Sequence, residues 1–278
     1  MPQTSYLTAP AIGLNGSPAD CGIKKDLALA AEGTVPVGIA VVRGTAEEQV
    51  KQPAAPAAAS ATAIIASGFA TAATAVTKGT ADANGAIGAT RIWPPRNLTA
   101  TFSSHADVDA GTLLLKGITP AGDVVEETLY VPDAGNTTLV GKVCFEYFLE
   151  ARLSPMAGVG GAVTIGIGTD MGPISGRDVV GASMYDSGKV TQTDYAEDDV
   201  VSVRRKGNLF VTSETVTTKG EPVWVRFVAG GAEVRGAFRK DADGSAGAPD
   251  ACLLRGARWA RTITAAGVSE IELDLAAG

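Results

Sequence analysis

The chain has little of the material from which metal sites, disulfide frameworks and active sites are usually built. Its 278 residues include one histidine, His105, and three cysteines, Cys21, Cys144 and Cys252. The cysteines are odd in number, lie far apart and lack a C-x-x-C spacing, so neither a disulfide framework nor a zinc site is expected. One histidine cannot supply a histidine-based metal site. We therefore expect no metal, no cofactor and synthesis in a reducing cytoplasm.

Long apolar runs and a basic excess are also missing. No stretch of about 18 strongly apolar residues is present, so the sequence predicts no membrane-spanning helix. Residues 1–16 have neither the basic start nor the apolar stretch of a secretion signal. The formal net charge of −7 would repel a phosphate backbone, and no basic cluster is larger than Arg204-Arg205-Lys206. We therefore expect neither a membrane nor a nucleic-acid partner.

Small and aliphatic residues dominate what is present. Hydrophobic residues make up 45% of the chain but aromatic residues only 5%, and there are 34 glycines. Ala, Val, Ile and Leu therefore supply most of the apolar material, which together with many glycines favours β-strands joined by tight turns. The length favours two domains, or one domain that carries a large insertion.

The order of the strand patterns indicates that the insertion is the better description. Residues 34–42 form a strand-like run, and a Pro/Ala-rich stretch at residues 52–59 follows it. Residues 61–76 fit a strand or a helix about equally. Between residues 91 and 168, short alternating segments separated by glycines predict an antiparallel sandwich that includes a hairpin over residues 111–131.

Strand patterns return in the last third of the chain. The predicted strands there are residues 200–203, 209–212, 223–228, 232–239 and 271–275, with turns at 206–208 and 219–222 and a strand entry at 256–259. If these strands share a sheet with residues 34–42, the middle of the chain is inserted. We predict an all-β fold: a discontinuous β-barrel/sandwich base domain from residues 1–52 and 177–278, and an inserted antiparallel β-sandwich domain from residues 53–176.

An acidic stretch near the C-terminus, RKDADGSAGAPD at residues 239–250, invites a calcium-site hypothesis. Asp241 and Asp243 alternate as calcium ligands do, but Gly244 arrives two positions too early for the known loop motif. Asp and Gly also stabilise turns, and we weigh the turn at roughly ten to one over a metal site. We interpret the stretch as a long, acidic, flexible connection.

Other candidate sites have simpler explanations. His105 lies between Ser104 and Asp107, but triad residues come from separate elements and meet in space. The acids at 126–127 and 197–199 fit strand edges or turns, where charge discourages edge-to-edge pairing, better than a glycosidase pair. Trp93 precedes two prolines and is at least as suited to fixing a strand entry as to a contact. We predict that the protein is not an enzyme.

Several short motifs lie at the two ends of the chain and in its middle. The end motifs are YLTAPA at 6–11, residues 16–20, VPVGIAVVRGT at 35–45, GASMYD at 181–186, YAEDDVVSVRRKG at 195–207, GEPVWVR at 220–226, GAFR at 236–239, residues 241–244, and GARW at 256–259. The middle motifs are IWPPRNLT at 92–99 and residues 122–129, 142–145 and 163–168. By these motifs the two ends resemble the structural cement, or capsid-stabilising decoration, proteins of tailed bacteriophages. The middle resembles a β domain of other phage virion proteins, and the shorter cement proteins lack it.

This resemblance implies a non-enzymatic virion protein, made in the host bacterial cytoplasm, that binds the outer capsid surface and clamps neighbouring major capsid subunits. A homo-oligomer is expected, with a trimer favoured over a dimer. The insert would either project outward or bridge to a neighbour. Candidate contacts with the capsid or between subunits are Tyr6, Leu7, Pro10, Ile12, Arg204, Arg205, Trp224, Arg258 and Trp259.

Two other functions remain open from the sequence alone. The first is a surface-exposed adhesin that binds a glycan or a host molecule, with the insert as its reader and Trp93 or Tyr147 as a stacking platform. The second and weaker one is an all-β hydrolase built on His105 and the acids.

Overall fold

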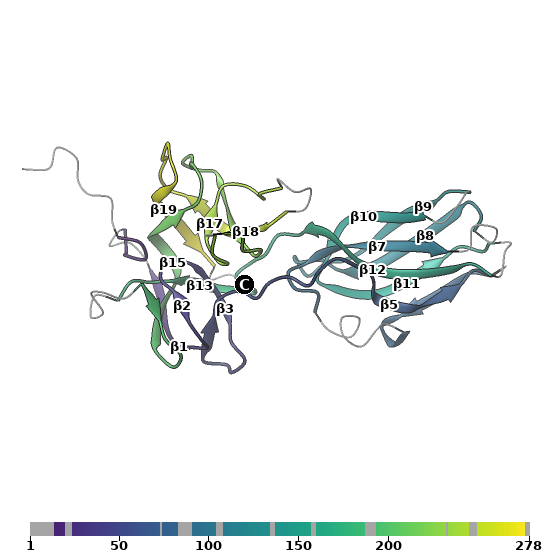
Figure 1. Cartoon of the computed structure of the whole chain (residues 1–278), viewed down its shortest axis with the longest axis horizontal. Coiled ribbons are helices and arrows are strands. Elements are labelled where there is room, and N and C mark those ends of the chain that lie inside the picture. Colours follow the sequence, from purple (N-terminus) through teal and green to yellow (C-terminus); the bar gives the residue numbers. More distant parts are fainter. Residues whose placement is uncertain are drawn as a thin grey trace, which may run out of the picture. The chain divides into compact units, whose positions relative to one another are not determined.

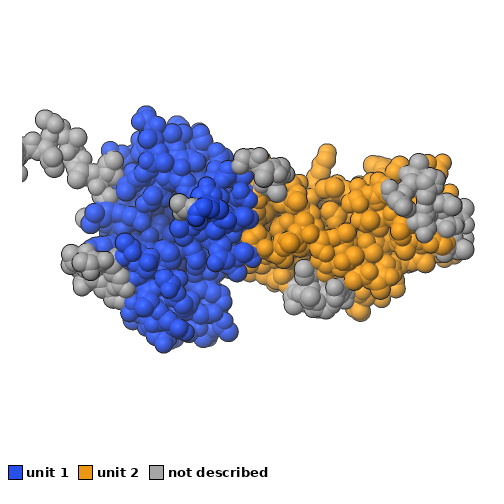
Figure 2. All heavy atoms as spheres, viewed as in Figure 1, with its two compact units in different colours: residues 1–55, 174–243, 250–278 blue, residues 56–173, 244–249 orange. Residues whose placement is uncertain are grey.

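The computed structural model describes residues 14–19, 24–72, 74–82, 91–103, 108–133, 137–156, 160–186, 193–231, 233–244 and 249–275. The chain forms two compact units (Figure 2). Unit 1 comprises residues 1–55, 174–243 and 250–278, and unit 2 comprises residues 56–173 and 244–249. The predicted all-β fold class is confirmed, because the elements of the described residues are strands apart from one short 3-10 turn, η1 (Thr80–Asp82). No helix in this part of the chain is long and apolar enough to cross a membrane.

Unit 1 is built around one long strand, β15 (Val200–Ser213). The described strands of this unit share the order β1-β4-β3-β13-β15-β17-β16-β18-β19, with β1 and β19 each pairing back onto β15 (Figure 1). These two extra pairings close the sheet into two rings that share β15. The other strands are β1 (Lys25–Ala31), β2 (Val35–Pro36), β3 (Ala40–Arg43), β4 (Gln49–Lys51), β13 (Val179–Ser183), β14 (Asp194–Tyr195), β16 (Pro222–Arg226), β17 (Phe238–Arg239), β18 (Ala251–Trp259) and β19 (Gly267–Asp274).

Each ring encloses aliphatic side chains that alternate along its strands. In the first ring, Val201 and Val203 of β15 pack with Val35 and Val41, and Tyr195 closes the cluster. The Tyr195 hydroxyl donates a hydrogen bond to the Met184 carbonyl at 2.6 Å. In the second ring the buried side chains include Leu209, Val211, Val223, Val225, Phe238, Leu254, Trp259 and Ile271. Alternation of this kind is the period-2 pattern that β structure imposes on one buried face.

Several strand boundaries in unit 1 differ from the predicted ones. The turn predicted at residues 206–208 is wrong, because β15 runs straight through Gly207 at φ 104°. The single strand predicted at 34–42 is divided into β2 and β3, because Gly38 at φ 74° makes a turn there. Of the strand predicted at 232–239, the described residues 233–239 contain only β17, and residues 256–259 end β18 rather than begin a strand.

The expected pairing between the N-terminal and C-terminal parts of the chain is present. Strand β3 pairs antiparallel with β13, and β1 pairs antiparallel with β15 from Ala30 opposite Val200 to Lys25 opposite Lys206. A short β2–β14 pair places Val35 opposite Tyr195.

Unit 2 is a sandwich of two sheets within the described residues. One has the order β10-β7-β12-β5 and the other the order β6-β11-β8-β9 (Figure 1). Side chains of both sheets form one buried cluster, with Leu98 and Phe102 from one and Leu113 and Leu115 from the other. The strands are β5 (Ser60–Ala70), β6 (Val76–Gly79), β7 (Arg96–Ser103), β8 (Gly111–Ile118), β9 (Val124–Val131), β10 (Thr137–Phe145), β11 (Tyr147–Leu153) and β12 (Ala162–Met171).

The structure tests two sequence predictions in this unit. The segment that fitted strand or helix equally is mainly the strand β5, which pairs with β12. The predicted hairpin is confirmed as β8 and β9, paired from Ile118 opposite Val124 to Gly111 opposite Val131. The predicted Pro/Ala stretch at residues 52–59 has no regular secondary structure.

Candidate functional site

The two arginines singled out on β15 hold unit 1 together. Arg204 has no exposed side-chain surface and forms a bidentate pair with Asp26 of β1, with Nε–Oδ1 at 2.9 Å and Nη2–Oδ2 at 3.0 Å. Its Nη1 also donates to the Asn208 carbonyl at 2.7 Å. Arg205 Nη2 donates to the carbonyls of Gly176 at 3.1 Å and Leu275 at 2.8 Å. Arg204 therefore serves the fold, and only Arg205 retains some accessible surface.

The two tryptophans of the predicted contact set, Trp224 and Trp259, also differ in exposure. Trp259 ends β18 with its side chain fully buried, and its indole Nε1 has no hydrogen-bond partner among the described residues. Trp224 on β16 is only half-buried, in register with Arg239 of β17 and Leu253 of β18. A side chain without exposed surface cannot reach a partner unless the fold opens. Of this pair, Trp224 alone remains available for a contact.

Arg258 is the exposed member of the predicted set, with 63% of its side chain accessible. It pairs in bidentate fashion with Glu272 of β19, with Nε–Oε2 at 2.8 Å and Nη2–Oε1 at 3.0 Å. This pairing raises the pKa of Arg258 and lowers the pKa of Glu272. The two side chains line an open groove of about 530 Å³ that also includes Asn208, Lys219, Gly220, Trp259, Ala260 and Glu270.

Further polar pairs continue along the same outward face. Lys206 of β15 lies 3.4 Å from Asp274 of β19, and Asn208 Nδ2 donates to Glu270 Oε1 at 2.6 Å. The strand register places these pairs beside the Arg258–Glu272 pair. We call this outward surface of β15, β18 and β19 the Arg258 face and define it by Lys206, Asn208, Arg258, Glu270, Glu272 and Asp274. Its charges are already held in position by one another, which suits a specific polar contact.

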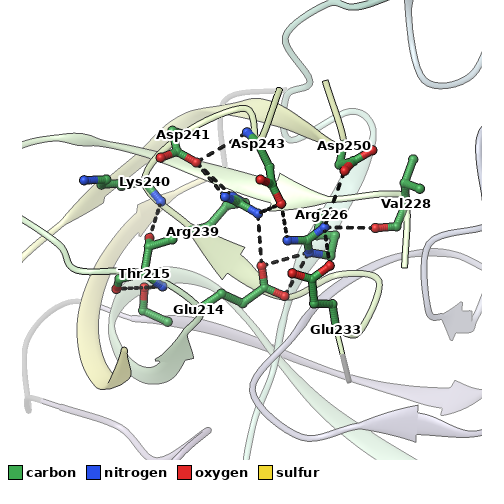
Figure 3. A network of polar contacts seen from close by, with 11 residues as sticks. Glu214, Thr215, Arg226, Val228, Glu233, Arg239, Lys240, Asp241, Asp243 and Asp250 are labelled. Atoms are coloured by element: carbon green, nitrogen blue, oxygen red, sulfur yellow. Dashed lines mark hydrogen bonds and ion pairs between the residues drawn. The ribbon is translucent and has the colours of Figure 1, made fainter. Parts of the chain in front are cut away.

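The acidic stretch at residues 239–250 contributes to a network of ion pairs rather than to a flexible connection (Figure 3). Arg226 of β16 is 1% exposed, and its Nε donates to both carboxylate oxygens of Glu214 at 2.9 and 2.8 Å. Its Nη2 lies 2.6 Å from Asp243 Oδ2, and its Nη1 lies 3.0 Å from Glu233 Oε2. Arg239 of β17 pairs with Asp243 as well.

Arg239 extends the network to the start of the acidic stretch. Its Nη2 lies 2.7 Å from Asp241 Oδ1, and its Nη1 lies 3.4 Å from Glu214 Oε2. Figure 3 shows the Glu214 carboxylate between the two guanidinium groups. The flexible interpretation is therefore wrong for residues 239–244, because Asp241 and Asp243 neutralise arginines that the fold has buried. Residues 245–248 lie outside the described residues.

The electrostatics of this network indicate a structural role. Burial raises the pKa of Glu214, while the hydrogen bond from Arg226 lowers the pKa of Asp243. Both oxygens of Glu214 accept hydrogen bonds from Arg226, so this carboxylate is the direct partner of a buried guanidinium. No group of His, Cys, Asp and Glu side chains in the described residues could hold a metal ion.

The remaining sequence candidates fall into two groups. Tyr6, Leu7, Pro10, Ile12, His105 and Cys21 lie outside the described residues. In unit 2, the Arg91 guanidinium lies over the Trp93 ring, 4.7 Å from the ring centroid. The Tyr147 side chain is 38% exposed. Sequence reasoning missed Glu214, Arg226 and Arg239, because isolated charges in strands show no pattern until the strands are paired.

Comparisons with known proteins agree with this structural character. The family model described as "Structural cement protein (E217 gp24/Pam3 gp6)", a phage family, matches residues 136–274. The matched half of the chain contains β13 to β19 of unit 1, including the Arg258 face and the network around Arg226, and β10 to β12 of unit 2. No curated protein matches the chain. The chain belongs to the phage structural cement protein family and is a structural protein of the virion.

Proposed function

We propose that the protein binds the outer surface of a phage capsid and cements neighbouring major capsid subunits. The observation that carries this proposal is the family match, which includes every strand of unit 1 after residue 174. The predicted base domain at residues 1–52 and 177–278 would bind the capsid. The predicted insert at residues 53–176 would be carried by it.

The construction of unit 1 supports a role in bearing load. Strand β15 is shared by two closed rings, so separating either ring from the other requires breaking strand pairs on β15. The ion pairs of Arg226 and Arg239 join the end of β15 to β16 and β17. A protein that resists internal pressure needs such cross-connections, because force on one strand is then distributed over several.

Two surfaces are proposed for the capsid contact. The first is the Arg258 face, with Arg205 and Trp224 as further candidates. The second is the N-terminal segment with Tyr6, Leu7, Pro10 and Ile12, because the chain that follows it is firmly tied to unit 1. Asn15 Nδ2 donates to the Val37 carbonyl at 2.7 Å, and Asn15 Oδ1 accepts from the Thr212 amide at 2.8 Å.

The expected assembly is a homo-oligomer, with a trimer favoured over a dimer. A cement protein is repeated many times over a capsid, so each contact can be weak while the whole array holds. Apolar side chains would supply affinity, and the paired charges of the Arg258 face would supply specificity.

The binding part of the proposal is tested by co-sedimentation of the full chain with capsids that lack it. We expect saturable binding to the outer surface and weaker binding by the Arg258→Glu variant, which places like charge beside Glu272. Arg43→Glu is the matched control, because Arg43 is exposed on β3 away from this face. Capsids that bind no protein at saturating concentration would refute the proposal.

A further inference from the structure

Among the described residues of unit 2, no strand pairs with the outer edge of β9. Strand β9 has β8 as its only neighbour within the described sheet. The Thr119 amide donates to the Asp123 carbonyl at 2.9 Å, so these two residues form a hydrogen-bonded pair. Hydrogen-bonded and non-hydrogen-bonded pairs alternate along an antiparallel ladder, so the backbone groups of the odd-numbered residues of β9 bond to β8. The backbone groups of Val124, Glu126, Thr128 and Tyr130 point to the open edge.

The acids that the sequence suggested as guards of this edge are both engaged inside the unit. Glu126 Oε1 lies 3.0 Å from Lys116 Nζ on β8. Glu127 Oε1 accepts the Lys142 amide of β10 at 2.6 Å, and both of its oxygens lie 3.3 Å from the Val143 amide. Neutralised or hydrogen-bonded carboxylates repel an approaching strand much less than free ones do, so the usual protection of an edge is weakened here.

Large apolar side chains flank these acids. Val124 at the start of β9 is 57% exposed, and Tyr130 near its end is 78% exposed. Thr128, also exposed, lies between them on the same face. Pro132 follows the strand and has no amide hydrogen, so any added strand must end its pairing at Tyr130.

We propose that β9 pairs antiparallel with β9 of a second copy of this chain, about a two-fold axis at Glu127. In this register the outward-pointing backbone groups of Val124 and Tyr130 bond to each other across the axis, as do those of Glu126 and Thr128. Each Val124 side chain then meets the partner copy's tyrosine at position 130. A shift by two residues toward the N-terminus would oppose Glu126 to itself, and a shift toward the C-terminus would require a donor at Pro132.

The expected partner is a second copy of the chain, because β9 is complementary to itself. In a two-fold pairing of identical strands each residue must suit the residue that lies opposite it, and β9 meets that condition at both pairs whose backbone groups point to the open edge. The contact adds one strand pair and buries little area, so a single contact is weak. On a capsid, where copies are fixed close together, many such contacts would link neighbouring oligomers. The pairing goes beyond the proposed capsid binding and does not depend on it.

The test is charge complementation across the proposed axis, measured by sedimentation velocity of the full chain without capsids. The unmodified chain should gain mass beyond its basic oligomer as it approaches about 1 mM, the effective concentration of tethered copies. Val124→Glu and Tyr130→Lys should each weaken this association about tenfold, because each variant replaces both apolar cross-strand pairs. Both side chains are exposed, so the fold should survive. Mixed together, the two variants should associate as strongly as the unmodified chain, through one Glu–Lys and one Val–Tyr pair.

Two control variants test the proposed register of the β9–β9 pair. Val200→Glu changes an equally exposed valine of β15 and should leave the association unchanged. Val140→Lys, exposed on β10, should not rescue Val124→Glu, because residue 140 does not face residue 124 in the proposed pair. No gain of mass in the unmodified chain, or no rescue in the mixture, would overturn the proposal. Unchanged self-association of Val124→Glu together with lost capsid binding would instead assign this edge to the capsid protein.

Discussion

Arg226 shows how a single buried charge can depend on residues that lie far apart in the sequence. Its guanidinium is 1% exposed and forms ion pairs with the carboxylates of Glu214, Glu233, Asp243 and Asp250. A buried cation is tolerated only when paired and hydrogen-bonded. Its removal would leave carboxylates without their partner in a partly buried position.

We predict that Arg226→Met lowers the free energy of unfolding by about 3 kcal/mol, since breaking a buried pair on one side is costly. Arg258→Met is the matched control, because it removes an exposed arginine whose pair with Glu272 is screened by solvent, and it should cost much less than Arg226→Met. Urea unfolding followed by tryptophan fluorescence measures both. Equal losses in the two variants would show that the Arg226 network does not stabilise the fold.

Glu32 provides a pH-dependent test at the same scale. The Lys51 ammonium at 2.7 Å, helped by hydrogen bonds from the Thr45 amide and hydroxyl, lowers the pKa of Glu32 from 4.5 to about 2. A lowered carboxyl pKa contributes stability above the unfolded value of 4.5, and this contribution is lost as the pH falls toward about 2. NMR titration should show the Glu32 carboxyl signal moving near pH 2, and a midpoint near 4.5 would contradict the contacts described.

The same pH dependence should appear in a mutant comparison. Glu32→Gln should reduce stability at neutral pH, and the difference from the unmodified chain should shrink as the pH falls below about 4.5. Glu48→Gln, which changes an exposed carboxylate in the turn between β3 and β4, is the matched control.

The sequence did not predict which charged residues are buried or which partners they have. The spacing of Asp241, Asp243 and Gly244 argued against a calcium loop, but nothing in it indicated that Arg226 and Arg239 would be buried beside these acids. Likewise Arg204 and Arg258 both resembled exposed cations in the sequence. Only the strand register shows that Arg204 faces Asp26 inside unit 1 while Arg258 faces solvent.

At the scale of elements, β15 determines the architecture of unit 1. Its N-terminal half pairs with β1 and its C-terminal half with β19, and the change of partner occurs at Lys206 and Gly207. Gly207 has φ 104°, a conformation that side chains rarely adopt. A glycine between two apolar runs is therefore part of a continuous strand here and not a turn.

We predict that Gly207→Ala destabilises the protein by about 1–2 kcal/mol, because alanine is strained at this positive φ. Gly244→Ala is the control, since Gly244 has no such φ and a Cβ there would meet nothing within 4 Å. Thermal unfolding monitored by circular dichroism compares the two variants. A Gly207→Ala protein as stable as the control would mean that β15 does not need glycine at this position.

The sequence predicted that strands are present more reliably than it predicted where they begin and end. The hairpin of β8 and β9 follows from alternation and a short glycine turn, both local signals. The continuity of β15 through Gly207 and the loss of most of the strand predicted at 232–239 depend on partners elsewhere in the chain. Local patterns carry no information about such partners, which is why the predictions failed there.

At the scale of the whole molecule, the chain combines a unit of two closed rings with a sandwich in which, within the described residues, β9 has an unpaired edge. The domain limits at residues 52/53 and 176/177 stay a prediction, as does the division of labour between capsid binding and the insert. The all-β class and the cement family could both be inferred from the sequence, because composition and several short motifs point the same way. The oligomer and the capsid contacts depend on a partner that one chain does not contain.

We propose that this protein strengthens a capsid by binding to its outer surface. The temperature at which DNA is released from particles that lack the protein, measured before and after the purified full chain is added back, tests this proposal. Release is expected at a lower temperature from the particles that lack the protein, with recovery that saturates as the sites fill. Particles that release DNA at the same temperature with and without the bound chain would rule the proposal out.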